Sequence, residues 1–306
     1  LRRYYRANFT NIIYNYGPVN LNNVIPLYYF RKLGFKVILD IVEDYDVAMN
    51  ISSSLFHRIK MHCITSLSRK TKDLASGVIV ISSHLKKKYV ALTKGKIPIH
   101  YRPISVDFDY FPDKINHFGN VITLFYSGSF GKKDGVPVLL DAFDRIASKY
   151  NNIRLTLTGK GSPEVIQATL SRIASSPHKS RIEYLGYLDD EVYYKTLNNA
   201  DILCMTRIDL AYANAGFPFK LGEFLASGKP VIASRVSDVE MLLENKKDVL
   251  LVKPGDVDEI VYAVDYLLSH RHDAAEMGVR GRKIANSHFD YISQGKSLLI
   301  FLKSLQ

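Results

Sequence analysis

The chain has 306 residues, 47% of them hydrophobic and 23% charged, a composition that is typical of globular domains and argues against disorder. This length suggests about two domains, and the longest apolar runs, such as SLLIFL, are too short to span a bilayer. The formal net charge of +11 is uneven, because residues 1–116 hold 18 Lys and Arg against 8 Asp and Glu, whereas residues 117–306 hold 23 against 22.

The basic excess lies in the first half and indicates contact with an anionic surface, whether anionic lipid, nucleic acid or a phosphorylated substrate. A basic surface that only faces solvent is the alternative. No aromatic-rich RNA-binding or helix-turn-helix signature accompanies the charge, so nucleic acid is not an expected partner. The two cysteines, Cys63 and Cys204, form no CxxC motif, and a reducing cytosol is the default location.

Strand and helix signals alternate along the chain. In the first half the expected elements are strands at 11–15, 37–41, 78–81 and near 97–101, a long helix at 53–75, a helix at 82–92 that begins with capping serines, and a linker at 107–120. In the second half they are strands at 121–127, 153–158, 182–185, 202–206, 230–234 and 249–252, with helices at 136–149, 163–175, 189–199, 218–227, 238–245 and 257–269. Apolar strands separated by helices indicate parallel sheets.

The sequence therefore predicts an α/β chain with two Rossmann-like, doubly wound domains. Their expected ranges are 1–116 and 117–286. A C-terminal helix at 287–306 is expected to pack on one domain or to cross back to the first. Ligands of doubly wound domains bind at the carboxyl ends of the strands, so the residues that follow each strand are the candidates for function.

Glycines follow several of these predicted strands. In YSGSFGKKDG a Gly-rich turn lets backbone N–H groups approach a phosphate, which Lys132 and Lys133 would neutralise. The turn lacks P-loop spacing, and a plain strand–helix connection is the alternative. Gly159 ends the next strand, and Gly186 and Tyr187 follow the third, where either a nucleobase would lie or the tyrosine ring would join the core.

The stretch NAGFPFKLGEFLASGKPVIAS places a short helix between a Gly-Phe-Pro turn and a strand. Leu221, Phe224 and Leu225 share the apolar face of this helix, whereas Glu223 falls beside Lys220. The start of the helix offers free N–H groups and a positive dipole end to a phosphate. A surface carboxylate on an amphipathic helix is the alternative interpretation of Glu223.

Two acidic residues, Glu43 and Asp44, follow the second predicted strand, and we expect them to face the cleft between the domains as candidate catalytic carboxylates. A capping or loop role is the alternative for either residue. His57, His62 and Cys63 match no standard set of metal ligands, so no metal site is expected.

Five motifs of the second half resemble, in order and spacing, those of the family 4 glycosyltransferases, which have the two-domain GT-B fold. The motifs are FYSGSFGKKDGVPVLLDAF, LTLTGKG, IEYLGYLDDEVYYKTLNNADILCMTR, AGFPFKLGEFLASGKPVIAS and VLLVKPGDVDEIVYAVDYLL. The resemblance covers about residues 121–270, and GVIVISSHLKKKY and ISVDFDYF give a weaker match in the first half. Such enzymes transfer a sugar from a nucleotide-diphosphate donor with retention of anomeric configuration, without a cofactor and usually without a metal.

The resemblance implies a set of donor-binding residues. Glu223 matches the second glutamate of the family's Glu-x7-Glu motif, which holds the ribose hydroxyls of the donor, and Gly186 and Tyr187 match positions near the base. The expected donor-binding residues are Gly128, Ser129, Lys132, Lys133, Gly159, Gly186, Tyr187, Ala215, Gly216, Phe217, Phe219, Lys220 and Glu223.

Three features depart from the family pattern. The first glutamate of the motif falls on Ala215, so a carboxylate to the donor sugar is missing. In the first Gly-rich loop the family's arginine and lysine fall on Ser129 and Asp134, and Lys132 or Lys133 would have to compensate. The family's opening strand and Gly-rich loop are not found upstream of the first residue, so the first domain is expected to be incomplete.

The sequence thus predicts a retaining glycosyltransferase that moves a sugar from a nucleotide-diphosphate donor to a glycan or lipid-linked acceptor in surface-polysaccharide biosynthesis. We expect it to act without a cofactor at the cytoplasmic face of an anionic membrane, which segments 58–72 and 86–96 would contact. The alternative is a non-catalytic, nucleotide-sugar-binding partner subunit, which Ala215 and the missing opening strand favour.

Overall fold

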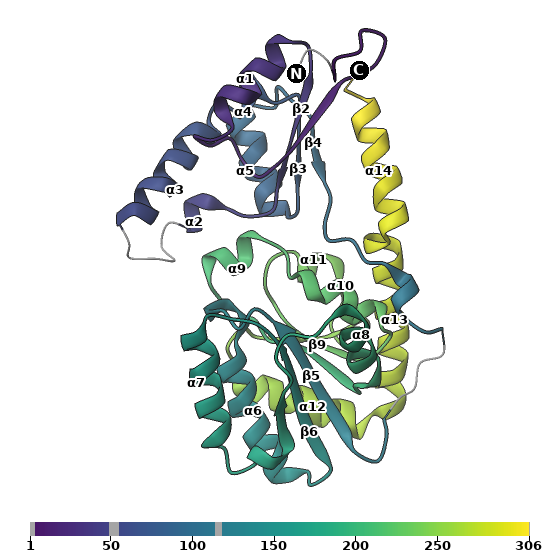
Figure 1. Ribbon diagram of the computed structural model, residues 1–306. Helices are drawn as coiled ribbons and strands as arrows, with labels where there is room; N and C mark the ends of the chain where they lie inside the picture. The colour runs from purple at the N-terminus through teal and green to yellow at the C-terminus, as the bar shows by residue number, and fades with distance from the viewer. Residues whose placement is uncertain (1–3, 49–54, 114–117, 306) are drawn as a thin grey trace. The chain divides into compact units, whose positions relative to one another are not determined.

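The structure of the protein is a computed structural model that describes residues 4–48, 55–113 and 118–305, and it divides into two compact units (Figure 1). The first unit comprises the described residues within Leu1–Ile104, Asn214–Phe217 and Ile292–Gln306, and the second those within Ser105–Ala213 and Pro218–Tyr291. Each unit contains one parallel sheet. The boundary predicted between residues 116 and 117 lies outside the described residues.

The sheet of the first unit has four parallel strands in the order β1-β2-β3-β4, so every connection steps to the same side. Right-handed crossovers that all step the same way place their helices on one face. The elements of this unit are β1 (Ile12–Tyr16), α1 (Val24–Lys32), β2 (Lys36–Ile41), α2 (Tyr45–Ala48), α3 (Leu55–Ser68), α4 (Thr71–Leu74), β3 (Gly77–Val80), α5 (Ser83–Thr93), β4 (Ile99–Tyr101) and α14 (Tyr291–Lys303).

The C-terminal helix α14 covers the other face of this sheet. Phe301, together with Leu305 just beyond the helix, forms a buried cluster with Ile38 of β2 and Ile79 of β3. The ring of His100 stacks on Phe301 with centroids 4.9 Å apart. Neighbouring residues along the strands point to the opposite face, where α1 and α5 pack. Both faces of the first sheet are therefore covered.

The single helix predicted over 53–75 is wrong. Residues 53 and 54 lie outside the described residues, and the remainder forms two helices, α3 and α4, which are separated at Arg69 and Lys70. The interruption lets the second helix turn Thr71 and Leu74 into the core, where they are 0% and 6% exposed.

The helix predicted at 82–92 is confirmed as α5. Ser82 precedes it, and the hydroxyl of Ser82 accepts a hydrogen bond from the backbone N–H of Leu85 at 3.2 Å. This bond satisfies one of the free N–H groups at the start of the helix, as an N-cap serine does.

The sheet of the second unit has six parallel strands in the order β10-β9-β8-β5-β6-β7. The chain steps from β5 to β6 and β7, then returns to the other side of β5 for β8, β9 and β10, so the strand order reverses between β5 and β8. The elements from residue 108 to residue 289 are η2 (Phe108–Tyr110), β5 (Ile122–Gly128), η3 (Lys132–Asp134), α6 (Val136–Lys149), β6 (Ile153–Gly159), α7 (Pro163–Ala174), η4 (Lys179–Arg181), β7 (Ile182–Tyr184), α8 (Asp190–Asn199), β8 (Ile202–Met205), α9 (Ala211–Ala215), α10 (Phe219–Ala226), β9 (Val231–Ser234), α11 (Val239–Leu242), β10 (Leu250–Val252), α12 (Val257–Ser269) and α13 (Arg271–Phe289).

Side chains of the central strand β5 alternate between two layers of helices. Leu124 and Tyr126 belong to a buried cluster with residues of α6 and α12. Phe125 points the other way, and its ring centroid lies 6.1 Å from that of Phe224 in α10 and 6.2 Å from that of Tyr193 in α8. The second sheet is thus doubly wound, with its core on both faces. Among the described residues, no helix combines the length and the apolar character that crossing a bilayer requires.

Candidate functional site

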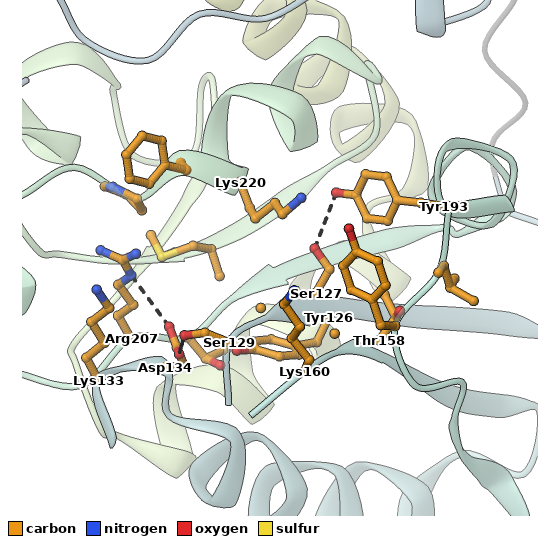
Figure 2. Close-up of a pocket in the computed structure, with 18 of the residues that line it drawn as sticks. Tyr126, Ser127, Ser129, Lys133, Asp134, Thr158, Lys160, Tyr193, Arg207 and Lys220 are labelled. Carbon is orange, nitrogen blue, oxygen red and sulfur yellow. Dashed lines mark hydrogen bonds and ion pairs between the residues drawn. The ribbon is translucent and has the colours of Figure 1, made fainter. Parts of the chain in front are cut away.

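A cavity of about 340 Å³ lies in the second unit at the carboxyl ends of β5, β6 and β8 (Figure 2). It occupies the point at which the strand order reverses, where the helices that follow neighbouring strands leave toward opposite faces of the sheet and a crevice remains between them. Its lining consists of residues 126–129, 133–134, 158–160, 187–188, 205–207 and 218–220, together with Asp190 and Tyr193.

Seven of the thirteen residues predicted to bind a donor line this cavity. They are Gly128, Ser129, Lys133, Gly159, Tyr187, Phe219 and Lys220. The six others, which lie outside the lining, are Lys132, Gly186, Ala215, Gly216, Phe217 and Glu223. The structure therefore brings together residues from four separate motifs, and their role in donor binding stays a prediction.

The ends of β5 and β6 approach each other so closely that glycine is required. Gly159 has φ +132°, and a Cβ atom on it would lie 1.9 Å from the carbonyl oxygen of Gly128. The carbonyl oxygen of Gly186 accepts hydrogen bonds from the backbone N–H of Gly159 at 2.8 Å and from Oγ1 of Thr158 at 2.7 Å. Gly186 thus shapes the end of β6 from outside the lining.

Ser129 and Asp134, the two positions where the family pattern has basic residues, pair with each other. The Ser129 hydroxyl donates to Oδ2 of Asp134 at 2.6 Å, and the backbone N–H of Gly131 donates to the same oxygen at 2.8 Å. Of the two lysines expected to compensate, Lys133 lines the cavity and Lys132 is exposed outside it. At these two positions the loop therefore carries a hydroxyl and a buried carboxylate rather than two cations.

Glu223 lies behind the cavity wall and is held by protein donors. It accepts hydrogen bonds from the hydroxyl of Tyr193 at 2.6 Å, from Nζ of Lys220 at 3.2 Å and from the hydroxyl of Tyr194 at 3.4 Å. Lys220 also lies over the ring of Tyr193, 4.3 Å from its centroid. Burial, and then the charge of Glu223, raise the pKa of Tyr193, so its phenol stays a donor. Glu223 thereby positions two residues that line the cavity.

The lining has more basic than acidic side chains. Lys133, Lys160, Arg207 and Lys220 contribute four positive charges against two negative charges from Asp134 and Asp190. Because concave, weakly solvated walls strengthen such an excess, the cavity favours an anionic ligand.

Lys160, Tyr193 and Arg207 were not among the residues predicted from the sequence. Lys160 and Arg207 come just after the ends of β6 and β8, so the rule that selected Gly128 and Gly159 would also have selected them. Tyr193 lies inside α8, where the sequence gives no signal for the direction of its hydroxyl.

Three other predicted residues belong to the first unit. Ala215 is 1% exposed, and its carbonyl oxygen accepts a hydrogen bond from the Ser82 hydroxyl at 2.5 Å. Phe217 is likewise buried, at 2% exposed, and Gly216 lies between the two. Ala215 is thus a buried residue at the end of α9, and its carbonyl group is already hydrogen-bonded.

The two candidate catalytic carboxylates of the first unit differ in environment. Glu43 is exposed, whereas Asp44 is buried and accepts hydrogen bonds from Nε2 of His84 at 2.7 Å and from the ammonium group of Lys88. Burial acts to raise the pKa of Asp44, but the hydrogen bonds from Lys88 and His84 outweigh it, and the pKa is lowered. Asp44 is therefore an ionised carboxylate with two basic partners, while a catalytic role for Glu43 or Asp44 stays a prediction.

The fold matches solved structures over most of the chain. Sucrose-phosphate synthase from Thermosynechococcus elongatus has a similar structure, with a TM-score of 0.78 and 18% identity, over 96% of this chain and 73% of that one. Anabaena HepE, solved in complex with UDP-glucose, matches with a TM-score of 0.76 and 15% identity over 95% of this chain and 78% of that one. The two parallel sheets are those of the GT-B fold of glycosyltransferases.

The sequence then identifies the family. Residues 121–270 match the family described as "Glycosyl transferases group 1". The MMP alpha-(1->4)-mannosyltransferase of Mycolicibacterium hassiacum is 28% identical over 196 residues, which are 64% of this chain and 46% of that relative. The matched segment of the second unit thus belongs to the group 1 glycosyltransferases. The chain spans less than half the length of the mannosyltransferases that it matches.

Proposed function

We propose that this protein is a retaining glycosyltransferase that moves a hexosyl group from a nucleotide diphosphate to a glycan or lipid-linked acceptor of a surface polysaccharide. The observation that carries the proposal is the basic cavity at the switch point of the second sheet. The match to a mannosyltransferase and the UDP-glucose in the HepE structure support a nucleotide sugar as the donor.

The lining suggests how such a donor would bind. The first residues of α10, Phe219 and Lys220, line the cavity, so the free N–H groups and positive dipole end of this helix favour the diphosphate. Tyr187 is 67% exposed, and Nζ of Lys160 lies 4.6 Å from the centroid of its ring, which leaves an aromatic surface for the base. Catalysis would rest on positioning and on stabilising the negative charge of the departing nucleoside diphosphate.

Two adjacent lysines provide a matched test of this assignment. Donor hydrolysis and transfer are measured across UDP-, GDP- and ADP-sugars, and the affinity for the matching nucleoside diphosphate is measured by calorimetry. Lys133→Met should weaken that affinity by about tenfold, because a charge-assisted contact is lost. Lys132→Met should leave it unchanged, since Lys132 is exposed outside the lining. Equal losses in both variants would contradict the assignment.

The partner-subunit alternative and the absence of a metal are tested in the same assay. Firm donor binding with neither hydrolysis nor transfer to any lipid-linked acceptor would favour a non-catalytic subunit. Because side-chain cations and the start of α10 supply the positive charge, transfer should survive EDTA. Complete loss on chelation, restored by Mg²⁺ or Mn²⁺, would show that the leaving-group chemistry is different.

The proposal places the first unit on an anionic membrane through α3. Leu55, Phe56 and Ile59 of this helix are 71%, 78% and 54% exposed, beside the basic residues Arg58 and Lys60. An apolar strip flanked by positive charge matches the interface of an anionic bilayer.

Vesicle sedimentation tests this membrane contact. Binding to phosphatidylglycerol vesicles should exceed binding to phosphatidylcholine vesicles and should weaken as salt rises. Phe56→Ser should reduce the bound fraction, whereas Ile300→Ser, which alters a residue of α14 that is 70% exposed, should not. Equal binding to both kinds of vesicle at all salt concentrations would exclude the electrostatic contact.

A further inference from the structure

Arg207 differs in its surroundings from the lysines around it. It follows Thr206, the first residue after β8, and lines the cavity (Figure 2). Its side chain is 12% exposed, compared with 40% for Lys220, while Lys160 is exposed. Among the described residues, its guanidinium makes a single, loose ion pair, with Nε 4.0 Å from Oδ1 of Asp134, and no hydrogen bond. Arg207 is therefore a nearly buried cation whose donors are almost all unused.

A buried guanidinium with unused donors requires an explanation, because taking it out of water is costly unless its N–H groups find acceptors. Burial lowers the pKa of Arg207 and the charge of Asp134 opposes this, yet an arginine stays protonated in proteins. The other oxygen of Asp134, Oδ2, accepts hydrogen bonds from the Ser129 hydroxyl and the Gly131 N–H. Asp134 can therefore orient Arg207 but leaves most of its planar fork of donors open to the cavity.

The position of Arg207 is fixed by the backbone around it. The N–H of Ile208 donates to the carbonyl oxygen of Lys133 at 3.0 Å, which ties the segment after β8 to the Gly-rich loop after β5. Thr206, on the other side, is 1% exposed and lines the cavity, and its Oγ1 has no hydrogen-bond partner among the described residues. A buried donor fork and a buried, unpartnered hydroxyl thus adjoin the same cavity.

We propose that Arg207 is a diphosphate-binding residue, which grips the phosphates of the ligand through two parallel N–H···O bonds and supplies the buried cation that the Ser129–Asp134 loop does not. Arginine presents its donors in a planar fork that matches phosphate oxygens, and lysine does not. The nucleotide in this proposal rests on the proposed function. The anion site itself rests on the geometry of the cavity alone.

Calorimetry with inorganic pyrophosphate, UDP, GDP and the nucleosides uridine and guanosine tests the proposal. Arg207→Met should weaken binding of pyrophosphate and of the preferred nucleoside diphosphate by about ten- to a hundredfold, and should leave nucleoside binding unchanged. Arg207→Lys, which keeps the charge but loses the fork, should fall between. Arg235→Met is the control, because Arg235 also follows a strand, β9, and pairs with Glu240 outside this cavity. Arg235→Met should bind pyrophosphate, UDP and GDP with the affinities of the native protein.

The outcomes separate this inference from the proposed function. If Arg207→Met binds every ligand as tightly as the native protein, the inference is overturned while the nucleotide site stands. If pyrophosphate binding depends on Arg207 but UDP and GDP bind no more tightly than pyrophosphate, the anion site stands and the nucleotide-sugar proposal fails. If the native protein binds none of these ligands, both the inference about Arg207 and the proposed function are refuted. Circular dichroism checks that each variant is folded. If Arg207→Met is unfolded, Arg207→Lys decides: pyrophosphate affinity equal to that of the native protein would overturn the inference.

Discussion

The two parallel sheets of this protein use similar strands but order them differently. In the first sheet every connection steps to the same side, whereas in the second the order reverses between β5 and β8. The cavity lies at that reversal, and its lining belongs to the second unit. The order of the strands, rather than their composition, accounts for the position of the crevice.

The two units also differ in how the charged side chains at their strand ends are paired. Asp44, just after β2, is satisfied by His84 and Lys88 within its own unit. Arg207, just after β8, has only a loose ion pair with Asp134 among the described residues. A charged residue after a parallel strand is thus a weak signal for a ligand site, and the signal becomes stronger when the residue also lies at a reversal of strand order and has no close partner.

The largest expected effect concerns the contact that shapes the cavity. In Gly159→Ala the new Cβ would lie 1.9 Å from the Gly128 carbonyl oxygen, so the end of β5 or β6 must move. We expect the free energy of unfolding to fall by more than about 3 kcal/mol, measured by urea denaturation. Gly186→Ala is the control: its φ is +68° and no atom lies within 4 Å of the added Cβ, so the loss should be about 1 kcal/mol. Equal losses would mean that the close approach is not required.

The next effect tests the covering of the first sheet by α14. Phe301 is 8% exposed and packs on Ile38 and Ile79, so Phe301→Ala should lower the free energy of unfolding by about 3–4 kcal/mol. Its neighbour Ile300 is 70% exposed, and Ile300→Ala should change stability by less than about 0.5 kcal/mol. A small effect of the Phe301 change would show that the sheet does not need this helix on its second face.

A smaller effect is expected on ligand binding from Glu223→Ala. The change removes the acceptor that holds Tyr193 and Lys220, and with it the carboxylate predicted to bind the ribose hydroxyls. The affinity for a nucleoside diphosphate should fall about ten- to a hundredfold, which corresponds to roughly 1.5–3 kcal/mol. Glu191→Ala, at an exposed position of α8, serves as the control in the same calorimetric titration. Unchanged binding in a folded Glu223→Ala protein would refute the assignment.

The smallest effect is a change in stability, which should distinguish Asp44 from Glu43, the two carboxylates that follow β2. Because the pKa of Asp44 is lowered in the folded protein, its contribution to stability is complete above the pKa of the unfolded chain and is lost as the pH falls. Asp44→Asn should therefore cost about 1–3 kcal/mol near neutral pH, and the difference from the native protein should shrink below about pH 4. Glu43→Gln, at an exposed position, should leave stability within about 0.5 kcal/mol throughout. A pH-independent loss in Asp44→Asn would argue against the ionised carboxylate.

The sequence predicts the strands of the second unit well, because short apolar runs such as those at β5 and β6 are bounded by glycine and polar residues. It does not predict α13, because most of its 19 residues, RHDAAEMGVRGRKIANSHF, are polar and its buried face consists largely of alanine and glycine, which give a weak apolar signal. It also joins α3 to α4, since nothing in the local pattern of residues 55–74 marks the break that tertiary packing of Thr71 and Leu74 imposes.

The features of the candidate site likewise fall into those that the sequence predicts and those that it does not. Glycines and lysines after strands, such as Gly128, Gly159 and Lys133, could be selected because topology alone brings strand ends together. The pairing of Ser129 with Asp134 and the three donors around Glu223 depend on side-chain directions across different elements. Those directions are set by packing and have no counterpart in the order of residues.

The return of α14 to the first sheet has a consequence for synthesis. Strands β1 to β4 leave the ribosome well before Phe301 and Leu305, the residues that cover Ile38 and Ile79. The whole of the second unit lies between them in the chain. During translation one apolar face of the first sheet therefore stays uncovered until α14 has been made. This nascent surface is where a chaperone would bind, and a chain that terminates before α14 would be prone to aggregation.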